Sequence, residues 1–433
     1  MKQLLFMIPA MIVGTFGCFY THPYQGVLVY YLFAVLRPQF IWQWSLPDVA
    51  WSFYVAIASI LATIGWRCGL LSFEGDDAEC RFNIGHYCTI AFGIWIVITY
   101  FTAINKDVAY QYLIEYIKIF TMFIIGKYAI CTLNHLWSIY IAVALSICYI
   151  SYEINDIYFT QSYLYVYKRG YGGLDNNGAA LMLAMGVPLC LYTWDGLKHW
   201  LRWAILLFIP IILHAVLTSY SRGAMLSLAL TTPIYLLRCR QRGQLFIILL
   251  GVGALIPILA GKEIRERFFS IEQHDVDDSA NSRKKSWAIA LQMAQERPVF
   301  GMGIRNSNLF TFAYGADMEG RTIHSQWLQI AADSGYPALA FYIAAFAAVF
   351  YCCHCVRHAL RGRDDADARK TTIIANGCEG SLLLFCIGAT FLSLEHFELP
   401  YILLLLGSQL WSICEASNSF SRPPESSTTS IEG

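Results

Sequence analysis

The sequence predicts an all-α, polytopic membrane protein, and its composition gives the first support. Of its 433 residues, 57% are hydrophobic and only 14% are charged, which excludes an ordinary soluble globular protein of this length. Tyr and Trp gather near the ends of apolar runs, for example at Trp42, Trp44, Trp194 and Trp200, where amphipathic rings suit a membrane interface. The formal net charge is zero, so the lipid bilayer, and no nucleic acid, is the expected partner.

About twelve apolar segments have the length of a membrane-spanning helix, taking about 20 residues for each span. Near the N-terminus Pro23, Arg37, Pro38 and Pro47 interrupt the runs, so a short or re-entrant helix is an alternative there, and the choice between twelve and thirteen spans stays open. The predicted segments are 4–20, 24–41, 48–66, 88–104, 108–126, 129–150, 178–194, 201–217, 220–237, 244–261, 335–356, 373–394 and 398–416.

Basic residues orient the second half of the chain. They fall in alternate loops, near 198–202, 238–242 and 357–370, which the positive-inside rule assigns to the cytoplasm. The loops between them then face the periplasm. The chain divides accordingly into an N-terminal transmembrane region (1–150), a central transmembrane region (151–261) with a Tyr-rich periplasmic loop (151–177), a long periplasmic loop (262–334), C-terminal transmembrane helices (335–416) and a cytoplasmic tail (417–433) expected to be disordered.

The 262–334 segment is the one long hydrophilic insertion, and long ordered loops are usually functional. Residues 283–297 have helical character, with Trp287, Leu291 and Ala294 spaced along one face. This pattern predicts an amphipathic helix on the membrane surface. Pro298 and the Gly301–Gly303 turn end it.

Arg222 is the first candidate site residue, because it lies between two apolar spans joined by almost no loop. An arginine at the membrane boundary is costly and marks function by default, and its guanidinium fork suits a phosphate. The alternative is a topology anchor, although positive charge on the periplasmic side opposes the usual bias.

Two further candidates lie in the long loop. Arg283 begins the amphipathic helix with Lys284 and Lys285 beside it, which indicates either a phosphate-facing cluster or ordinary solvent-exposed charge. His324 lies where the chain re-enters a helix, and it is either a proton acceptor near neutral pH or a surface or capping residue. His214 and His396 are minor candidates on the same reasoning.

The sequence shows no metal-binding constellation and no nucleotide-binding glycine pattern. HExxH, paired CxxC and DxD-like groupings are missing from the loops assigned to the periplasm, as are Walker and Rossmann motifs. We therefore expect neither a metal nor a cofactor.

An ordered set of motifs resembles the putative O-glycosylation ligases associated with exosortase systems, a subgroup of the O-antigen ligase and polymerase superfamily linked to exopolysaccharide biosynthesis. The sequence departs from that group at Gly178 and at the pair after Ser325, Gln326 and Trp327, which bears on the acceptor more than on the reaction. The matching motifs are 22–27 with 36–38, 173–177, 187–189, 221–223, 278–280 ahead of Arg283, Trp287, 297–298 with 301–303, and 324–325 ahead of 334–335.

The resemblance implies a glycosyltransferase in the bacterial inner membrane. Such an enzyme moves a glycan from a polyprenyl (undecaprenyl) diphosphate carrier to an acceptor hydroxyl on a glycan, lipid or protein at the periplasmic face, without a metal. By motif, the family's arginines and loop histidine correspond to Arg222, Arg283 and His324. His324 would be the base, and a single displacement would invert the anomeric carbon.

The resemblance also indicates second-rank contacts. Arg305 and Arg321 would touch phosphate or sugar, whereas Asp175, Asn176 and Asn177 would either bind sugar hydroxyls or cap the following helix.

Two other functions remain open on sequence grounds. A repeat-unit polymerase of the same superfamily uses the same kind of donor and differs only in its acceptor. A transporter or flippase can also have a dozen spans, but no inverted repeat or broken helix pair is visible. The sugar, the acceptor and the oligomeric state cannot be read from the sequence.

Overall fold

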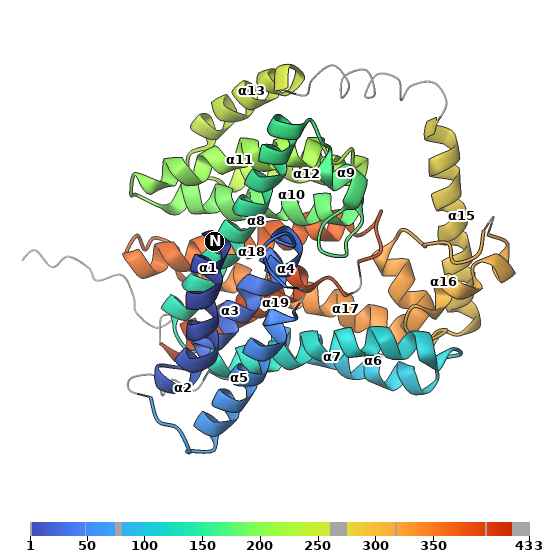
Figure 1. Cartoon of the computed structure of the whole chain (residues 1–433), viewed down its shortest axis with the longest axis horizontal. Coiled ribbons are helices and arrows are strands. Elements are labelled where there is room, and N and C mark those ends of the chain that lie inside the picture. The colour runs from blue at the N-terminus through green and yellow to red at the C-terminus, as the bar shows by residue number, and fades with distance from the viewer. Residues whose placement is uncertain are drawn as a thin grey trace, which may run out of the picture.

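The computed structural model describes residues 2–47, 49–73, 80–259, 275–316, 318–394 and 396–417, with the backbone alone for Lys2, 252–259 and 275–280. Within these residues the chain is helical (Figure 1), and the one pairing of extended backbone is an isolated bridge between Tyr171 and Leu174. The helices are α1 (Lys2–Ile12), η1 (Val13–Gly17), α2 (Cys18–Tyr20), α3 (Tyr24–Leu36), α4 (Pro38–Ile41), α5 (Trp51–Arg67), α6 (Ile84–Phe101), α7 (Lys106–Ala129), α8 (Leu133–Gln161), α9 (Tyr165–Arg169), α10 (Asn176–Gly196), α11 (Leu201–Leu217), α12 (Arg222–Arg238), α13 (Arg242–Leu259), α15 (Asp275–Glu296), α16 (Asn306–Phe310), η2 (Phe312–Tyr314), α17 (Gln326–Ala359), α18 (Ala366–Gly388) and α19 (Glu398–Ala416).

The all-α, multi-pass fold class is confirmed. Among the described residues, eight helical segments are long and apolar enough to cross a membrane, and α11 and part of α13 are shorter apolar helices. Within the described residues, each of the thirteen predicted segments falls on one or more helices; residues 48 and 260–261 of these segments, like the predicted tail from 418, lie outside the described residues. The count of clear spans is lower than predicted because helices such as α5 and α12 have only 17 residues, about 26 Å of helix against a hydrocarbon core of roughly 30 Å.

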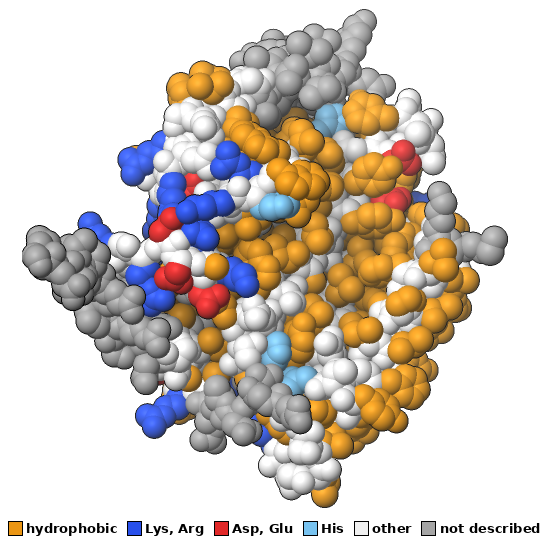
Figure 2. All heavy atoms as spheres, turned by 90° about the vertical axis from the view of Figure 1, so that its left-hand side faces the viewer, with side chains coloured by type: hydrophobic (Ala, Val, Ile, Leu, Met, Phe, Trp, Pro, Cys, Tyr) orange, Lys and Arg blue, Asp and Glu red, His pale blue; other side chains and the backbone are white. Residues whose placement is uncertain are grey.

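Contacts between distant loops show which helix ends share a side. At one end of the bundle, the Lys370 ammonium donates to the Asn134 side chain at 3.0 Å, and the Asn83 amide donates to the Ser408 carbonyl at 2.7 Å. Since the arginine-rich loops lie here too, we call this the basic end. Figure 2 faces it and shows Lys and Arg side chains gathered on part of the surface.

The opposite end, on the right of Figure 1, carries the long loop, and we call it the loop end. The Asn105 backbone N–H donates to the Asn306 side chain at 2.6 Å, and the Tyr171 hydroxyl donates to the Leu36 carbonyl. The rings of Phe6 and Trp42 lie 5.7 Å apart, which places the start of α1 here as well. The helix directions of the first third, open from the sequence, are thereby set.

Three helices form the centre of the bundle. In the most apolar 18-residue stretch of each helix, 94% of the residues are buried in α10, 78% in α18 and 83% in α19. Small residues allow this close packing, as is usual between membrane helices. A Cβ added at Gly380 of α18 would lie 3.0 Å from side-chain atoms of both Pro188 and Tyr192, so α10 and α18 are in contact along their length.

Two helices extend into segments that were predicted as periplasmic loops. Helix α8 continues to Gln161, so the loop begins at Ser162 and not at residue 151. Helix α17 begins at Gln326, within the segment predicted as the long loop, and at Gly335 its backbone leaves the helical conformation (φ 80°, ψ 173°), so a first helix after His324 and the span predicted from 335 are joined across a kink at this glycine.

The long loop is folded around a small hydrophobic core of its own. The core joins α15 to the start of α17 and is separate from that of the bundle; its buried members are Ile289, Ala290, Met293, Met302, Ala316, Ile323 and Ala332. Leu291, predicted on the apolar face of this helix, is 43% exposed, whereas Ile289, Ala290 and Met293 are buried in the loop core. In Figure 1, α15 runs across the direction of α6, α7 and α17, beyond their ends.

Candidate functional site

Arg222 begins α12 at the loop end of the bundle. Tyr220 ahead of it has φ 56°, a left-handed conformation that costs a non-glycine residue roughly 1–2 kcal/mol. This turn sets Ser221 as the N-cap, whose hydroxyl accepts the Ala224 N–H at 3.4 Å. The exposed Arg222 side chain therefore adds its charge to the positive end of a helix dipole.

Arg283 lies within electrostatic range of Arg222, although 60 residues separate them in the sequence. The Arg283 side chain on α15 is half-buried, while those of Lys284 and Lys285 are exposed. Burial, and then the charge of Arg222, lower the pKa of the Arg283 guanidinium. Two like charges held together in this way form a site that favours an anion.

His324 completes the group from the start of α17. Its backbone is left-handed, with φ 57°, and its carbonyl accepts a hydrogen bond from the Trp287 indole at 3.3 Å. Burial lowers the pKa of the imidazole, and so do the charges of Arg283 and Arg321, while Asp175 raises it. The imidazole is therefore neutral near pH 7 and able to accept a proton.

Asp175, Asn176 and Asn177 connect this group to α10. The Asp175 carboxylate accepts the Gly178 N–H at 2.7 Å and caps α10, so the capping interpretation describes this residue. It also lies close enough to raise the pKa of His324. The Asn176 amide donates to the Ser219 carbonyl at 3.2 Å, and the Asn177 amide donates to the Asn176 oxygen at 3.3 Å, so these two residues brace the turn that precedes Arg222.

The remaining predicted arginines divide between two places. Arg321 lies near His324, as its effect on the histidine pKa shows. Arg305, also in a left-handed conformation, instead lies 5.3 Å from the Tyr112 ring centroid. There its charge, after burial, lowers the pKa of His396 to about 4, so Arg305 and His396 belong to a neighbouring polar group.

His214 has a structural setting. It lies buried within α11, bonded to the Asn155 side chain and between the rings of Tyr158 and Phe159.

The sequence reasoning missed Asp333, which holds the loop in place. It is 1% exposed, and its carboxylate accepts the Ser307 N–H at 2.8 Å and the Gln329 amide at 2.7 Å. The Gly303 N–H donates to its carbonyl at 2.8 Å. A lone acid within an apolar helix was the signal that could have revealed it.

Within the described parts of the chain, no three His, Cys, Asp or Glu side chains come together as a metal site would require. The positive charge in the group around His324 comes from arginine side chains.

Fold and site together define a multi-pass membrane protein with a folded loop that closes a cationic site over the helix ends. Residues 206–343 match the family model for O-antigen ligase, Wzy_C. The matched segment contains Arg222, Arg283 and His324, and it supports the O-antigen ligase superfamily for this chain. A search of curated proteins found no match.

Proposed function

We propose that the protein transfers a glycan from a polyprenyl diphosphate carrier to an acceptor hydroxyl. The observation that carries the proposal is the meeting of Arg222 and Arg283, from separate segments, beside a neutral His324. Placing two guanidinium groups together is unfavourable unless an anion lies between them, and a diphosphate presents the oxygens that such forks bind bidentately.

The proposed reaction is a single displacement. His324 accepts the proton of the acceptor hydroxyl, the hydroxyl oxygen forms a bond to the anomeric carbon, and the bond from that carbon to the diphosphate oxygen breaks. Arg222 and Arg283 stabilise the negative charge that grows on the departing polyprenyl diphosphate. Attack opposite to the leaving group inverts the anomeric configuration, and the arginines take the part that a metal plays in other transferases.

We assign auxiliary roles in the reaction to Asp175, Arg321 and Arg305. Asp175 stabilises the imidazolium that forms when His324 takes the proton, since its charge raises the pKa of that histidine. Arg321 adds a further positive charge for phosphate or sugar. Arg305, which lies over the ring of Tyr112 and near His396, is proposed to contact phosphate or sugar.

The charge distribution also supports an orientation. The basic end of the bundle faces the cytoplasm under the positive-inside rule, so the loop end faces the periplasm of a bacterial inner membrane. The ordered motifs favour the exosortase-associated subgroup and hence a ligase of the O-glycosylation type; the polymerase alternative differs only in its acceptor.

The test is a transfer assay with purified protein, polyprenyl-diphosphate-linked glycan and candidate acceptors, in the presence of EDTA. Wild type should transfer glycan, while Arg222→Ala, Arg283→Ala and His324→Ala should each lose roughly 10²–10³ in rate. Lys284→Ala, an exposed neighbour on α15, is the matched control and should stay active.

The product decides between the alternatives. Longer lipid-linked chains would identify a polymerase, and glycan on another acceptor would identify a ligase. Intact donor moved across proteoliposomes, with no change in linkage, would instead support a transporter and refute the proposal.

A further inference from the structure

A cavity of about 320 Å³ lies at the basic end of the bundle, far from the site around His324. It opens between the ends of α10, α12 and α17 and the start of α18. Its walls include Tyr192, Leu360 and Ile373, but most of its polar lining is cationic. Six arginines line it, namely Arg238, Arg240, Arg357, Arg361, Arg363 and Arg369.

A buried carboxylate holds two of these arginines. Glu379 of α18, whose side chain is 10% exposed, pairs with Arg238 at 2.9 Å and also with Arg357. Each of these contacts uses one of the five N–H groups that a guanidinium carries. Glu379 therefore ties the last turns of α12 and α17 together and leaves N–H donors to spare.

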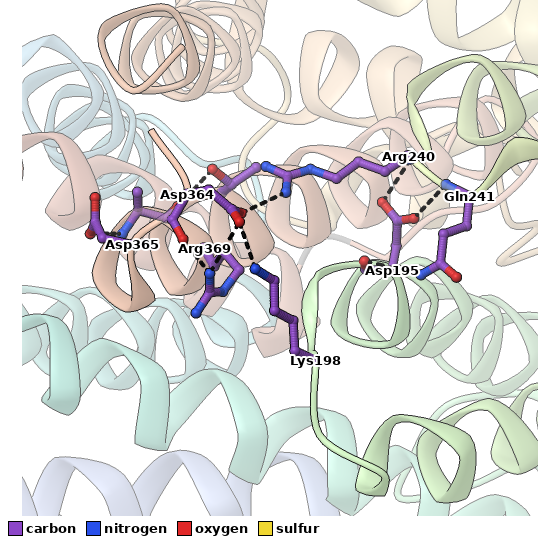
Figure 3. A network of polar contacts seen from close by, with 9 residues as sticks. Asp195, Lys198, Arg240, Gln241, Asp364, Asp365 and Arg369 are labelled. Atoms are coloured by element: carbon purple, nitrogen blue, oxygen red, sulfur yellow. Dashed lines mark hydrogen bonds and ion pairs between the residues drawn. The ribbon is translucent and has the colours of Figure 1, made fainter. Parts of the chain in front are cut away.

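A second carboxylate, that of Asp364 in the loop between α17 and α18, also holds basic side chains together (Figure 3). Asp364 contacts Lys198 at 2.6 Å, Arg240 at 3.2 Å and Arg369 at 3.5 Å. Its hydrogen bonds to Lys198 and Arg240 lower the pKa of the Asp364 carboxyl to about 2. The loop acid thus draws three cations around the cavity.

The other two acids near the cavity are also engaged. Asp195 accepts the backbone N–H groups of Arg240 and Gln241, both at 3.0 Å. Asp365 caps α18 through the Ala368 N–H at 2.9 Å and pairs with Arg363 at 3.0 Å. Their carboxylates therefore hold the loops around the cavity.

Positive charge remains in excess. Seven basic side chains, the six arginines and Lys198, face four carboxylates at this place. The C-termini of α10, α12 and α17 contribute roughly half a negative charge each, and the N-terminus of α18 roughly half a positive one, which is less than the excess. Arg361 makes no ion pair with any residue that the structure describes.

We infer that this cavity binds a phosphate-bearing anion, either the headgroup phosphate of an anionic phospholipid or a free phosphate. The positive-inside rule accounts for arginines on this side of the membrane, but it does not require six of them to line one cavity around shared carboxylates. Arginine forks bind phosphate oxygens bidentately, and basic pockets between membrane helices receive lipid headgroups.

The inference is independent of the proposed glycan transfer, although the two sites share helices. Helix α12 has Arg222 at its other end, and α17 begins two residues after His324. An anion in the cavity would bridge the far ends of these helices and so stabilise their packing.

The test compares thermal unfolding of the full-length protein in two settings. In nanodiscs, phosphatidylcholine alone is compared with phosphatidylcholine containing phosphatidylglycerol; in neutral detergent, inorganic phosphate is added. The variants are Arg361→Gln and the double variant Arg361→Gln, Arg363→Gln. Arg202→Gln, at the same end but outside the cavity lining, is the charge-matched control.

We expect phosphatidylglycerol or inorganic phosphate to raise the unfolding temperature of wild type and of Arg202→Gln. The two cavity variants, Arg361→Gln and the double variant, should bind the same probe at least about tenfold more weakly. Stabilisation by phosphatidylglycerol alone would assign the site to a lipid headgroup, and stabilisation by inorganic phosphate would assign it to a soluble anion. An equal response of the cavity variants and Arg202→Gln to both probes, or no response of wild type to either, would overturn the inference.

Discussion

The indole of Trp287 donates a hydrogen bond to the carbonyl of His324 at 3.3 Å, across 37 residues of sequence. The contact links α15, which carries Arg283, to the left-handed turn that presents the imidazole. A single side chain thus fixes the relative position of a cation and a proton acceptor.

Replacing Trp287 by Phe should slow transfer up to about tenfold, because one hydrogen bond contributes roughly 0.5–1.5 kcal/mol. The phenyl ring of the new residue would keep an aromatic contact with Phe391, which packs near the Trp287 ring. A positioning role predicts a lower kcat with an unchanged KM for the lipid-linked donor. Leu291→Ala, on the exposed face of α15, should leave both constants unchanged, and an equal loss in the two variants would contradict the role of the hydrogen bond.

The fall in transfer rate at low pH, the acid limb of the rate–pH profile, should follow protonation of the His324 imidazole. Because burial and neighbouring arginines lower its pKa below the ordinary value of 6.5, activity should persist below that pH and fall only when the imidazole becomes protonated. A limb centred above 6.5 would contradict the assignment.

Asp175→Asn should move that limb to still lower pH. The Asp175 charge raises the pKa of His324, so its removal lowers the pKa further. Asn caps helices as well as Asp does, so α10 should keep its stability in a thermal unfolding measurement. An unmoved limb would show that Asp175 serves only as a cap.

Asp333→Ala should loosen the long loop without unfolding the bundle. The change leaves the Ser307 N–H and the Gln329 amide without their acceptor, at a cost of about 1–3 kcal/mol for each buried donor. Limited proteolysis should then cut within 297–325 faster than in wild type. Asp107→Ala, an exposed acid at the same end, should keep the wild-type cleavage rate; equal rates in both variants would contradict the bracing role.

Much of the helical framework could be predicted from the sequence, because lipid requires every backbone group to be paired within helices. The interruption at Arg37 and Pro38 was also visible, and α3 ends at Leu36. The helix start after His324 and the span from 335 were visible as well, but their joining into one element across a kink at Gly335 was not.

The site could be predicted less fully. Motifs singled out Arg222, Arg283 and His324, but only tertiary structure could show Arg222 beside Arg283, or Arg305 in a neighbouring group. The six arginines at the basic end were read as markers of topology, because the convergence of four of them on Glu379 and Asp364 depends on tertiary packing.

The most direct test of the account measures donor binding and transfer separately. Purified wild type, His324→Ala, Arg222→Ala, Arg283→Ala and Lys284→Ala would be titrated with polyprenyl diphosphate and then assayed for glycan transfer. The account predicts that His324→Ala binds the lipid as wild type does but transfers glycan roughly 10²–10³ times more slowly, whereas both arginine variants bind the lipid at least about tenfold more weakly. Normal binding by the arginine variants, or transfer by His324→Ala at the wild-type rate, would contradict it.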